Sequence, residues 1–312
     1  MITLIAAIIL LFIQSCGKNE EATSPPVPSG PRWAEQTSGT SEVLLGISFV
    51  DANKGYAVGT TGIIKTTING GSGWSTQASG VTQFLRDIYF SDATTGSIVG
   101  EAGLILRTTN GSTWTPQTSG TTEHLVHVHF SSNNVGMAVG QGGVILKTVN
   151  GGAVWSTQAS STTAEIPCVY MINDSTAVAV GFGGIIRKTT NGGTNWISQT
   201  SGVTNDLRSV VFKDANIGVA VGMGGRIIRT TNGGTTWSPV SSGTSNALFS
   251  VTYVESSTFV TVGTNVVLRS SDDGQTWASQ SISVGGDLYS VVFKAVEKGW
   301  AVGQNGKIFH YN

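Results

Sequence analysis

Apolar and polar positions repeat along most of this chain with a period of 40 or 41 residues. The pattern is clearest in residues 207–237, where three short apolar runs (207–212, 218–222 and 226–230) precede a glycine-rich turn that ends at Trp237. Short runs enriched in β-branched residues and separated by such turns predict β-strands, and no helical periodicity of 3.6 residues accompanies them. A repeat of about 40 residues with four strands is typical of one blade of a β-propeller.

Tryptophan marks the same place in every repeat, just before the outermost predicted strand. The tryptophans in this place are Trp33, Trp74, Trp114, Trp155, Trp196, Trp237 and Trp277. The chain therefore holds six complete repeats and a seventh that is divided between its two ends.

The two ends of the repeat region predict how the ring closes. After Trp277 the chain supplies three more apolar runs but no outermost strand, whereas residues 33–36 form an outermost strand with no blade before it. We therefore predict that residues 33–36 pair with residues 306–311. The result is an all-β, seven-bladed propeller over residues 32–312, with four antiparallel strands in each blade. Removing residues 32–40 would leave an open sheet edge, which favours aggregation.

The segment before the propeller predicts export. Residues 1–13 are almost wholly apolar, too few to span a bilayer well but suited to the core of a signal peptide. Ser15 precedes Cys16, which resembles the lipobox of bacterial lipoproteins. We expect a lipoprotein signal peptide at 1–15, lipidation of Cys16, and an extended tether at 16–31, where four of the seven prolines lie. The alternatives are a signal cleaved without lipidation and a buried cysteine.

Composition narrows the classes of partner. Glycine accounts for 42 of the 312 residues and charged residues for 11%, as expected of short strands joined by tight turns. The formal net charge is −1, so no bulk field would attract nucleic acid or anionic lipid, and we expect membrane association only through the lipid anchor. The two cysteines, Cys16 and Cys168, exclude a disulfide-rich scaffold.

Residues 270–277 fit the turn motif called the Asp-box, with Asp272 at its centre. Other repeats carry asparagine at this place: Asn69, Asn110, Asn150, Asn191 and Asn232. The side-chain oxygen of Asp or Asn accepts amide protons of the turn, and the glycine adopts a left-handed conformation. Asp-boxes also occur in sialidases and other glycosidases, but on the outer rim and away from the active site. We therefore interpret the motif as structural.

A catalytic site should interrupt the repeat, because chemistry needs side chains that the other blades do not carry. The face that usually meets ligands holds the loops into the innermost strands and the turns between second and third strands. The ionisable residues expected there are Glu101, Glu123, Glu165, Asp206 and Asp287. They include no arginine triad of the sialidase kind and no evident acid and nucleophile pair for glycoside cleavage. We predict no catalytic residue and no cofactor.

One repeat departs from the others by holding three histidines at 124–129. On a strand, His127 and His129 point to the same side and could bind zinc or copper. The remaining histidine, His310, is distant in sequence, and no third ligand is evident. We therefore predict no metal site and interpret the pair as structural, with metal binding as the alternative. Cys168 occupies an equivalent position and is interpreted as a buried free thiol rather than a reactive one.

A column near the start of the innermost strands offers candidates for partner binding. It holds Leu45, Arg86, Val126, Pro167, Arg208, Phe249 and Tyr289. Arginine and aromatic side chains contribute strongly to interfaces, so Arg86, Arg208, Phe249 and Tyr289 are candidates for a docking patch at the channel. The alternative is that they only fill the channel mouth.

The repeat, read at residues 55–74 and 299–308, resembles that of the photosystem II stability/assembly-factor propellers, and the resemblance covers residues 33–312. It implies a seven-bladed propeller exported to the lumenal or periplasmic side and lipid-anchored in cyanobacteria. The family binds newly made reaction-centre subunits without catalysis, partly through arginines. Arg86 and Arg208 stand in the matching context of this chain.

From the residues and the resemblance together, we expect a membrane-anchored lipoprotein facing the periplasm or the cell exterior. It would bind a protein partner, such as a membrane complex of photosynthesis, and would not be an enzyme. The alternative is a carbohydrate-active propeller, either a sialidase-like or other glycoside hydrolase or a glycan-binding module. That alternative requires a central cleft with two or more carboxylates, for example Glu101 and Glu123.

Overall fold

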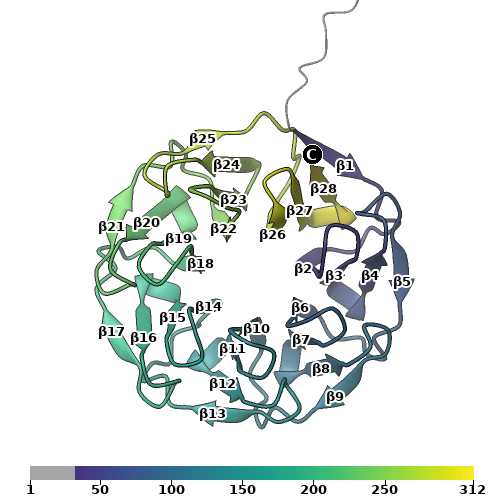
Figure 1. Cartoon of the computed structure of the whole chain (residues 1–312), viewed down its shortest axis with the longest axis horizontal. Coiled ribbons are helices and arrows are strands. Elements are labelled where there is room, and N and C mark those ends of the chain that lie inside the picture. The colour runs from purple at the N-terminus through teal and green to yellow at the C-terminus, as the bar shows by residue number, and fades with distance from the viewer. Residues whose placement is uncertain (1–31) are drawn as a thin grey trace, which may run out of the picture. The chain divides into compact units, whose positions relative to one another are not determined.

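The computed structural model describes residues 32–312, which form a closed ring of seven antiparallel four-stranded sheets (Figure 1). The sheets are arranged as blades around a central channel, with the first strand of each blade innermost. This arrangement confirms the all-β, seven-bladed propeller that the repeat predicts. None of the helices in residues 32–312 is long and apolar enough to cross a membrane.

The first four blades each hold four strands that follow one another from the channel outward. Blade 1 holds β2 (Leu44–Phe49), β3 (Gly55–Gly59), β4 (Ile64–Thr67) and β5 (Ser75–Gln77). Blade 2 holds β6 (Leu85–Phe90), β7 (Gly96–Gly100), β8 (Ile105–Thr108) and β9 (Thr115–Gln117). Blade 3 holds β10 (Leu125–Phe130), β11 (Gly136–Gly140), β12 (Ile145–Thr148) and β13 (Ser156–Gln158). Blade 4 holds β14 (Cys168–Met171), β15 (Ala177–Val180), β16 (Ile186–Thr189) and β17 (Ile197–Gln199).

The last three blades follow the same order. Blade 5 holds β18 (Leu207–Phe212), β19 (Gly218–Gly222), β20 (Arg226–Thr230) and β21 (Ser238–Val240). Blade 6 holds β22 (Leu248–Tyr253), β23 (Phe259–Gly263), β24 (Val266–Ser270) and β25 (Ala278–Ser279). Blade 7 holds β26 (Leu288–Ala295), β27 (Lys298–Gly303), β28 (Ile308–Tyr311) and β1 (Trp33–Gln36).

Blade 7 closes the ring with strands from both ends of the described chain. β1 pairs antiparallel with β28, from Trp33 opposite Tyr311 to Gln36 opposite Ile308 (Figure 1). The predicted closing pair is therefore confirmed. Gly306, which we placed in the paired segment, belongs instead to the turn before β28.

The hydrophobic core lies between neighbouring blades, as where Val178 and Val180 of blade 4 pack with Val210 and Phe212 of blade 5. Aromatic pairs add contacts within the blades. In five blades the phenylalanine near the end of the innermost strand meets the edge of the repeat tryptophan, as Phe212 meets Trp237 at 6.0 Å. Trp33 takes this place in blade 7 and meets Phe293 at 5.8 Å, so β1 completes the packing as well as the sheet.

The innermost strands are less apolar than the second strands because one side of each faces the channel. β7 is buried at every position, whereas in β6 Leu85 and Ile88 are buried but Arg86 and Tyr89 are only half-buried. The difference is caused by the open channel, which leaves part of each innermost strand without a packing partner.

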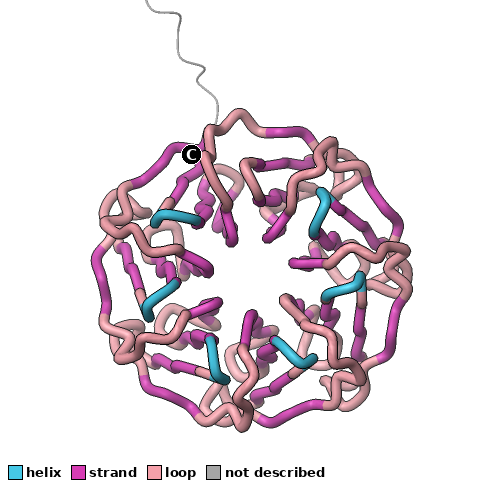
Figure 2. Tube along the Cα trace, turned by 180° about the vertical axis from the view of Figure 1, so that it is seen from behind, coloured by secondary structure: helices cyan, strands magenta, loops and turns pink. Residues whose placement is uncertain are grey.

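Short 3-10 turns join the second and third strands in all blades but blade 6. They are η1 (Thr60–Gly62), η2 (Glu101–Gly103), η3 (Gln141–Gly143), η4 (Phe182–Gly184), η5 (Met223–Gly225) and η6 (Gln304–Gly306), and Figure 2 shows them in a ring around the channel. Gly184 of η4 has φ +74°, and a Cβ atom there would overlap the carbonyl oxygen of Val203. The glycine thus lets the turn lie directly against the loop that leads to the next blade.

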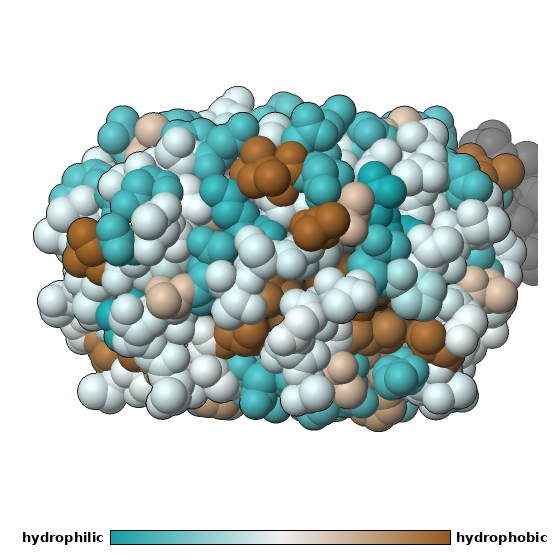
Figure 3. All heavy atoms as spheres, turned by 90° about the horizontal axis from the view of Figure 1, so that it is seen from below, coloured by the Kyte–Doolittle hydropathy of each residue, from teal (hydrophilic) through white to brown (hydrophobic). Residues whose placement is uncertain are grey.

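The side of the ring seen in Figure 3 is mainly hydrophilic or neutral, with apolar spots among the polar residues. The most exposed large apolar side chains of the described residues are Ile68, Val149, Val154 and Ile197. Single exposed apolar side chains are normal on a protein surface and do not define a site. Hollows in the surface lie in the channel and in the grooves between blades.

Candidate functional site

The channel is a cavity of about 370 Å³ lined by the innermost strands. A β-bulge near the start of these strands shifts their register with the second strand, as between Leu85 and Asp87 in β6 and between Leu207 and Ser209 in β18. The extra residue of a bulge is left unpaired, and its side chain is turned away from the ladder. In β6 and β18 that residue is Arg86 and Arg208, respectively.

These bulge residues, together with Pro167 of blade 4, form what we call the mouth ring. Its members, all of which line the channel, are Leu45, Arg86, Val126, Pro167, Arg208, Phe249 and Tyr289. The repeat alignment identifies this column. The bulge explains why the residue type varies in this column. It depends on strand pairing, so the spacing of the repeat does not predict it.

The two arginines of the mouth ring are held by neighbouring carboxylates. Arg86 forms an ion pair with Glu101 at 2.8 Å, and Arg208 lies 4.0 Å from Asp206. Arg208 also lies over the ring of Phe182, with its guanidinium carbon 4.4 Å from the ring centroid. Both arginines are therefore oriented in advance, and their positive charges are largely balanced locally.

Three of the four candidate docking residues lie on consecutive blades, and two of them are in contact. Arg208, Phe249 and Tyr289 lie on blades 5, 6 and 7, and the rings of Phe249 and Tyr289 are 5.4 Å apart. The Tyr289 hydroxyl donates to an Asp287 carboxylate oxygen at 3.3 Å and lies 3.2 Å from the side-chain amide of Gln304. Arg86 lies on blade 2, so it is separated from this group along the ring.

Deeper in the channel, side chains of one blade accept hydrogen bonds from the backbone of the next. Asp87 accepts the amide proton of Val128 at 3.0 Å, and Ser209 accepts that of Val251 at 3.2 Å. The thiol sulfur of Cys168 accepts a backbone amide in the same way, from Val210 at 3.4 Å. Polar side chains in this column therefore connect the inner edges of neighbouring blades.

Asp87, His127 and Cys168 meet on three successive blades. His127 Nε2 lies 3.8 Å from an Asp87 carboxylate oxygen and 3.7 Å from the Cys168 sulfur. Burial lowers the pKa of His127, but Cys168 and Asp87 outweigh this effect and raise that pKa to about 9. Burial also raises the pKa of Asp87, against the opposing effect of His127. Within residues 32–312, no group of three or more His, Cys, Asp or Glu side chains is arranged to hold a metal ion.

His129 has a structural contact that depends on its being neutral. Its Nδ1 atom accepts the amide proton of Met171 at 3.2 Å, and its ring packs between those of Tyr89 and Tyr170. Burial, followed by the charge of His127, lowers the pKa of His129 to about 3. A ring nitrogen that accepts a backbone amide proton is not free to bind a metal ion at the same time.

The carboxylates do not gather as a glycoside hydrolase would require. Glu101 is engaged with Arg86, Glu123 is exposed outside the channel wall, and Asp87 is the one carboxylate among the described residues that line the channel. Hydrolysis of a glycosidic bond normally uses two carboxyl groups that face each other across the substrate. Cys16, the expected signal peptide at 1–15 and the tether at 16–31 lie outside the described residues.

Sequence comparison places the repeat in a known family. The chain matches the family described as "Photosynthesis system II assembly factor YCF48" over residues 26–115, 74–208 and 241–312, which together make up well over half of its length. No curated protein sequence matches it.

Solved propellers have closely similar backbones. A structure described as "YCF48 bound to D1 peptide" has a TM-score of 0.76 and 22% identity, covering 89% of this chain and 96% of that one. YCF48 from Cyanidioschyzon merolae has a TM-score of 0.76 and 21% identity, with coverage of 90% and 99%. A streptogramin B lyase reaches a TM-score of 0.79 at 13% identity, with coverage of 90% and 97%. At these identities the likeness demonstrates the fold, which an enzyme and a peptide-binding protein share.

Proposed function

The chain belongs to the family of photosystem II assembly factors of the YCF48 type, and on that premise we propose that it is a non-catalytic propeller that binds a protein partner at the mouth ring. The partner would present an extended peptide segment, and the chain would assist the assembly of the membrane complex to which this segment belongs. The observation that carries the proposal is the placement of Arg208, Phe249 and Tyr289 on consecutive blades at the opening of the channel.

The chemistry of this group suits a peptide. Phe249 and Tyr289 offer adjoining aromatic faces, and Arg208 offers guanidinium N–H groups beyond those that meet Asp206. Arginine and aromatic side chains at the centre of an interface contribute most of the binding energy. The channel volume of about 370 Å³ admits the side chains of a peptide but no folded domain. The solved structure described as YCF48 bound to D1 peptide supports a peptide as the kind of partner.

Because Glu101 and Asp206 balance Arg86 and Arg208, attraction of opposite net charges would contribute little to affinity. The arginines would act mainly as oriented hydrogen-bond donors to carbonyl or carboxylate groups of the partner. We therefore expect the affinity for the partner to depend only weakly on salt concentration.

The proposal includes the membrane anchor. Residues 1–15 would direct export, lipidated Cys16 would hold the chain at the membrane, and the tether at 16–31 would let the propeller reach a partner in the periplasm or at the cell exterior. Incorporation of a clickable fatty acid into the chain, abolished by Cys16→Ser, tests this part. A chain that incorporates the label with serine at position 16 would contradict it.

Affinity capture from the host's membrane extract tests the partner. The chain lacking its signal peptide would recover a specific membrane protein, and the double variant Arg86→Ala/Arg208→Ala would lose it. Arg226→Ile, an arginine change in a groove outside the channel wall, is the matched control and should retain the partner. Recovery that is unaffected by the double variant, or recovery of no protein at all, would refute binding at the mouth ring.

A further inference from the structure

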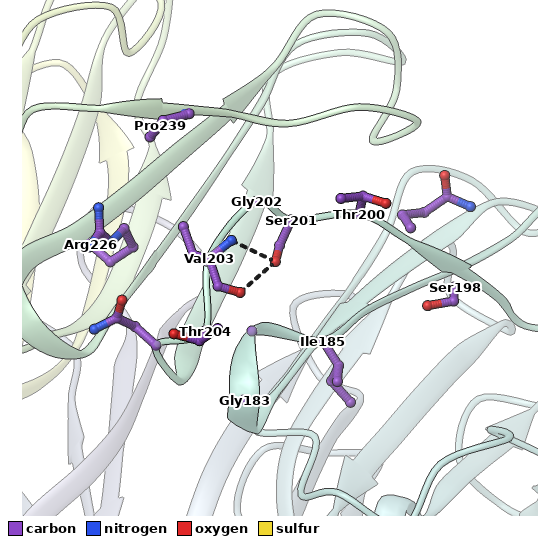
Figure 4. Close-up of a pocket in the computed structure, with 13 residues that line it drawn as sticks. Gly183, Ile185, Ser198, Thr200, Ser201, Gly202, Val203, Thr204, Arg226 and Pro239 are labelled. Carbon is purple, nitrogen blue, oxygen red and sulfur yellow. Dashed lines mark hydrogen bonds between the residues drawn. The ribbon is translucent and has the colours of Figure 1, made fainter.

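A second cavity, of about 590 Å³, lies in the groove between blades 4 and 5 (Figure 4). One side is formed by the turn at Gly183 and by residues 198–205, which lead from the outermost strand of blade 4 into blade 5. Arg226 and Pro239 of blade 5 form the other side. We call this cavity the Arg226 cleft.

Arg226 breaks the repeat. The equivalent positions of blades 1 to 4 hold apolar residues: Ile63, Leu104, Val144 and Ile185. Lys307 takes the place in blade 7, where its ammonium group donates to the carbonyl oxygens of Val284 and Gly285. Lys307 therefore has a structural role, which leaves Arg226 as the unexplained cation of this column.

Arg226 has no such partner. Its side chain makes no hydrogen bond, ion pair or aromatic contact with any residue from 32 to 312, and its Nε atom is buried without an acceptor. By contrast, Arg107 and Arg229 donate through Nε to the carbonyl oxygens of Gly151 and Asp273, both at 2.6 Å. A partly buried guanidinium without a protein acceptor is available to water or to an anionic ligand.

The rest of the lining offers neutral hydrogen-bonding groups. They are the hydroxyls of Ser198, Thr200 and Thr204 and the side-chain amides of Gln199 and Asn205, none of which bonds to another residue in the described part of the chain. Ser201 differs, because its hydroxyl is engaged with the backbone of Val203 (Figure 4). No carboxylate of residues 32–312 lines the cleft. One cation among free hydroxyls and amides favours a ligand that carries both an anionic group and several hydroxyls.

We infer that the Arg226 cleft binds a sugar that carries a carboxylate, such as a hexuronate. The planar guanidinium can hold a carboxylate with two parallel hydrogen bonds, while the amides and hydroxyls exchange hydrogen bonds with the sugar hydroxyls. Ile185 and Pro239 supply apolar surface for the C–H groups of the ring. The cavity is within the range of about 300–1,000 Å³ that is usual for small-molecule sites. A peptide is a less suitable ligand than a sugar, because the described residues that line the cleft include no aromatic side chain to anchor a peptide.

Titration with D-galacturonate and its neutral counterpart D-galactose tests the inference, using the full chain and NMR or calorimetry. The variant Arg226→Ile places in blade 5 the residue found at this position in blades 1 and 4, so the fold should be retained. We expect galacturonate to bind at least about tenfold more weakly to Arg226→Ile, as for loss of a hydrogen bond to a charged group. Asn205→Ala, which copies Ala164 of the preceding blade, should weaken binding without removing the preference for the charged sugar.

Four outcomes would overturn the assignment: no binding of galacturonate, equal binding of galactose, equal affinity in Arg226→Ile, or a tetraglutamate peptide binding as well as the sugar. The inference is independent of the proposed partner at the mouth ring. Arg226→Ile should still capture the protein partner while it loses the sugar. Measuring both in parallel therefore shows which of the two proposals has failed.

Discussion

Trp33→Ala tests whether the short β1 strand closes the ring. Trp33 is 8% exposed and packs against Phe293 at 5.8 Å and Tyr311 at 5.3 Å. Removing a buried tryptophan typically costs about 3–5 kcal/mol. β1 has only four residues, so a loss of this size should detach it from β28 and expose a sheet edge. We expect faster hydrogen exchange in the β28 amides that face β1, together with concentration-dependent aggregation below the melting temperature.

Trp237→Ala is the matched control. Trp237 is 7% exposed and meets Phe212 edge to face at 6.0 Å, so its removal should lower the free energy of unfolding by a similar amount. Trp237 directly precedes β21, which is joined to other strands of the chain at both ends and cannot dissociate as a free terminus. We expect lower stability in this variant without the selective exchange of β28 or the aggregation. Equal protection of β28 in the two variants would refute the reasoning, as would a monomeric Trp33→Ala protein.

Three further predictions concern single side chains. Ser161 has φ +58°, a conformation that strains a side chain, and the equivalent loops hold glycine there. Ser161→Gly should therefore raise the free energy of unfolding, measured by chemical denaturation, by up to about 1 kcal/mol. A lower free energy of unfolding would refute the strain. His129 has a pKa of about 3 in the folded chain and about 6.5 in the unfolded chain. Between these pH values the unfolded chain binds more protons, so the free energy of unfolding falls as the pH drops from 6.5 toward 3. Thermal melts of His129→Phe should lose part of this decline, and an unchanged pH slope would contradict the burial argument. Asp272 accepts two turn amides at 2.9 and 3.0 Å, so Asp272→Ala should cost about 1–2 kcal/mol. Asp272→Asn, which restores the residue of the other repeats, should cost less, and equal losses on melting would be inconsistent with this role.

The regular parts of this fold are predictable because they repeat. The 40- or 41-residue period, the glycine-rich turns and the tryptophans predict strands and blades from local pattern alone, and the unmatched strand at Trp33 predicts the closing pair with Tyr311. Each of these signals depends on the period of apolar positions or on backbone conformations that few residues tolerate. The docking column is also visible in the sequence, because aligned repeats show which positions vary.

The contacts between blades required the folded ring. Nothing in the repeat indicates that Asp87 accepts the amide proton of Val128, or that His129 accepts that of Met171. The Arg226 cleft was not predicted either, because the ionisable residues expected at a ligand-binding face lie in turns and loops, whereas Arg226 begins a third strand. Its signal was present as one cation in a column that is apolar in blades 1 to 4.

The sequence by itself determined the number of blades, the order of their strands and the closure of the ring, since these depend on local patterns that repeat along the chain. Only the tertiary structure decided which side chains meet across the channel and the grooves. Those contacts join residues about 40 positions apart, and their distances depend on how neighbouring blades pack and on where the innermost strands bulge. The absence of a partner for Arg226 among residues 32–312 also follows from that packing.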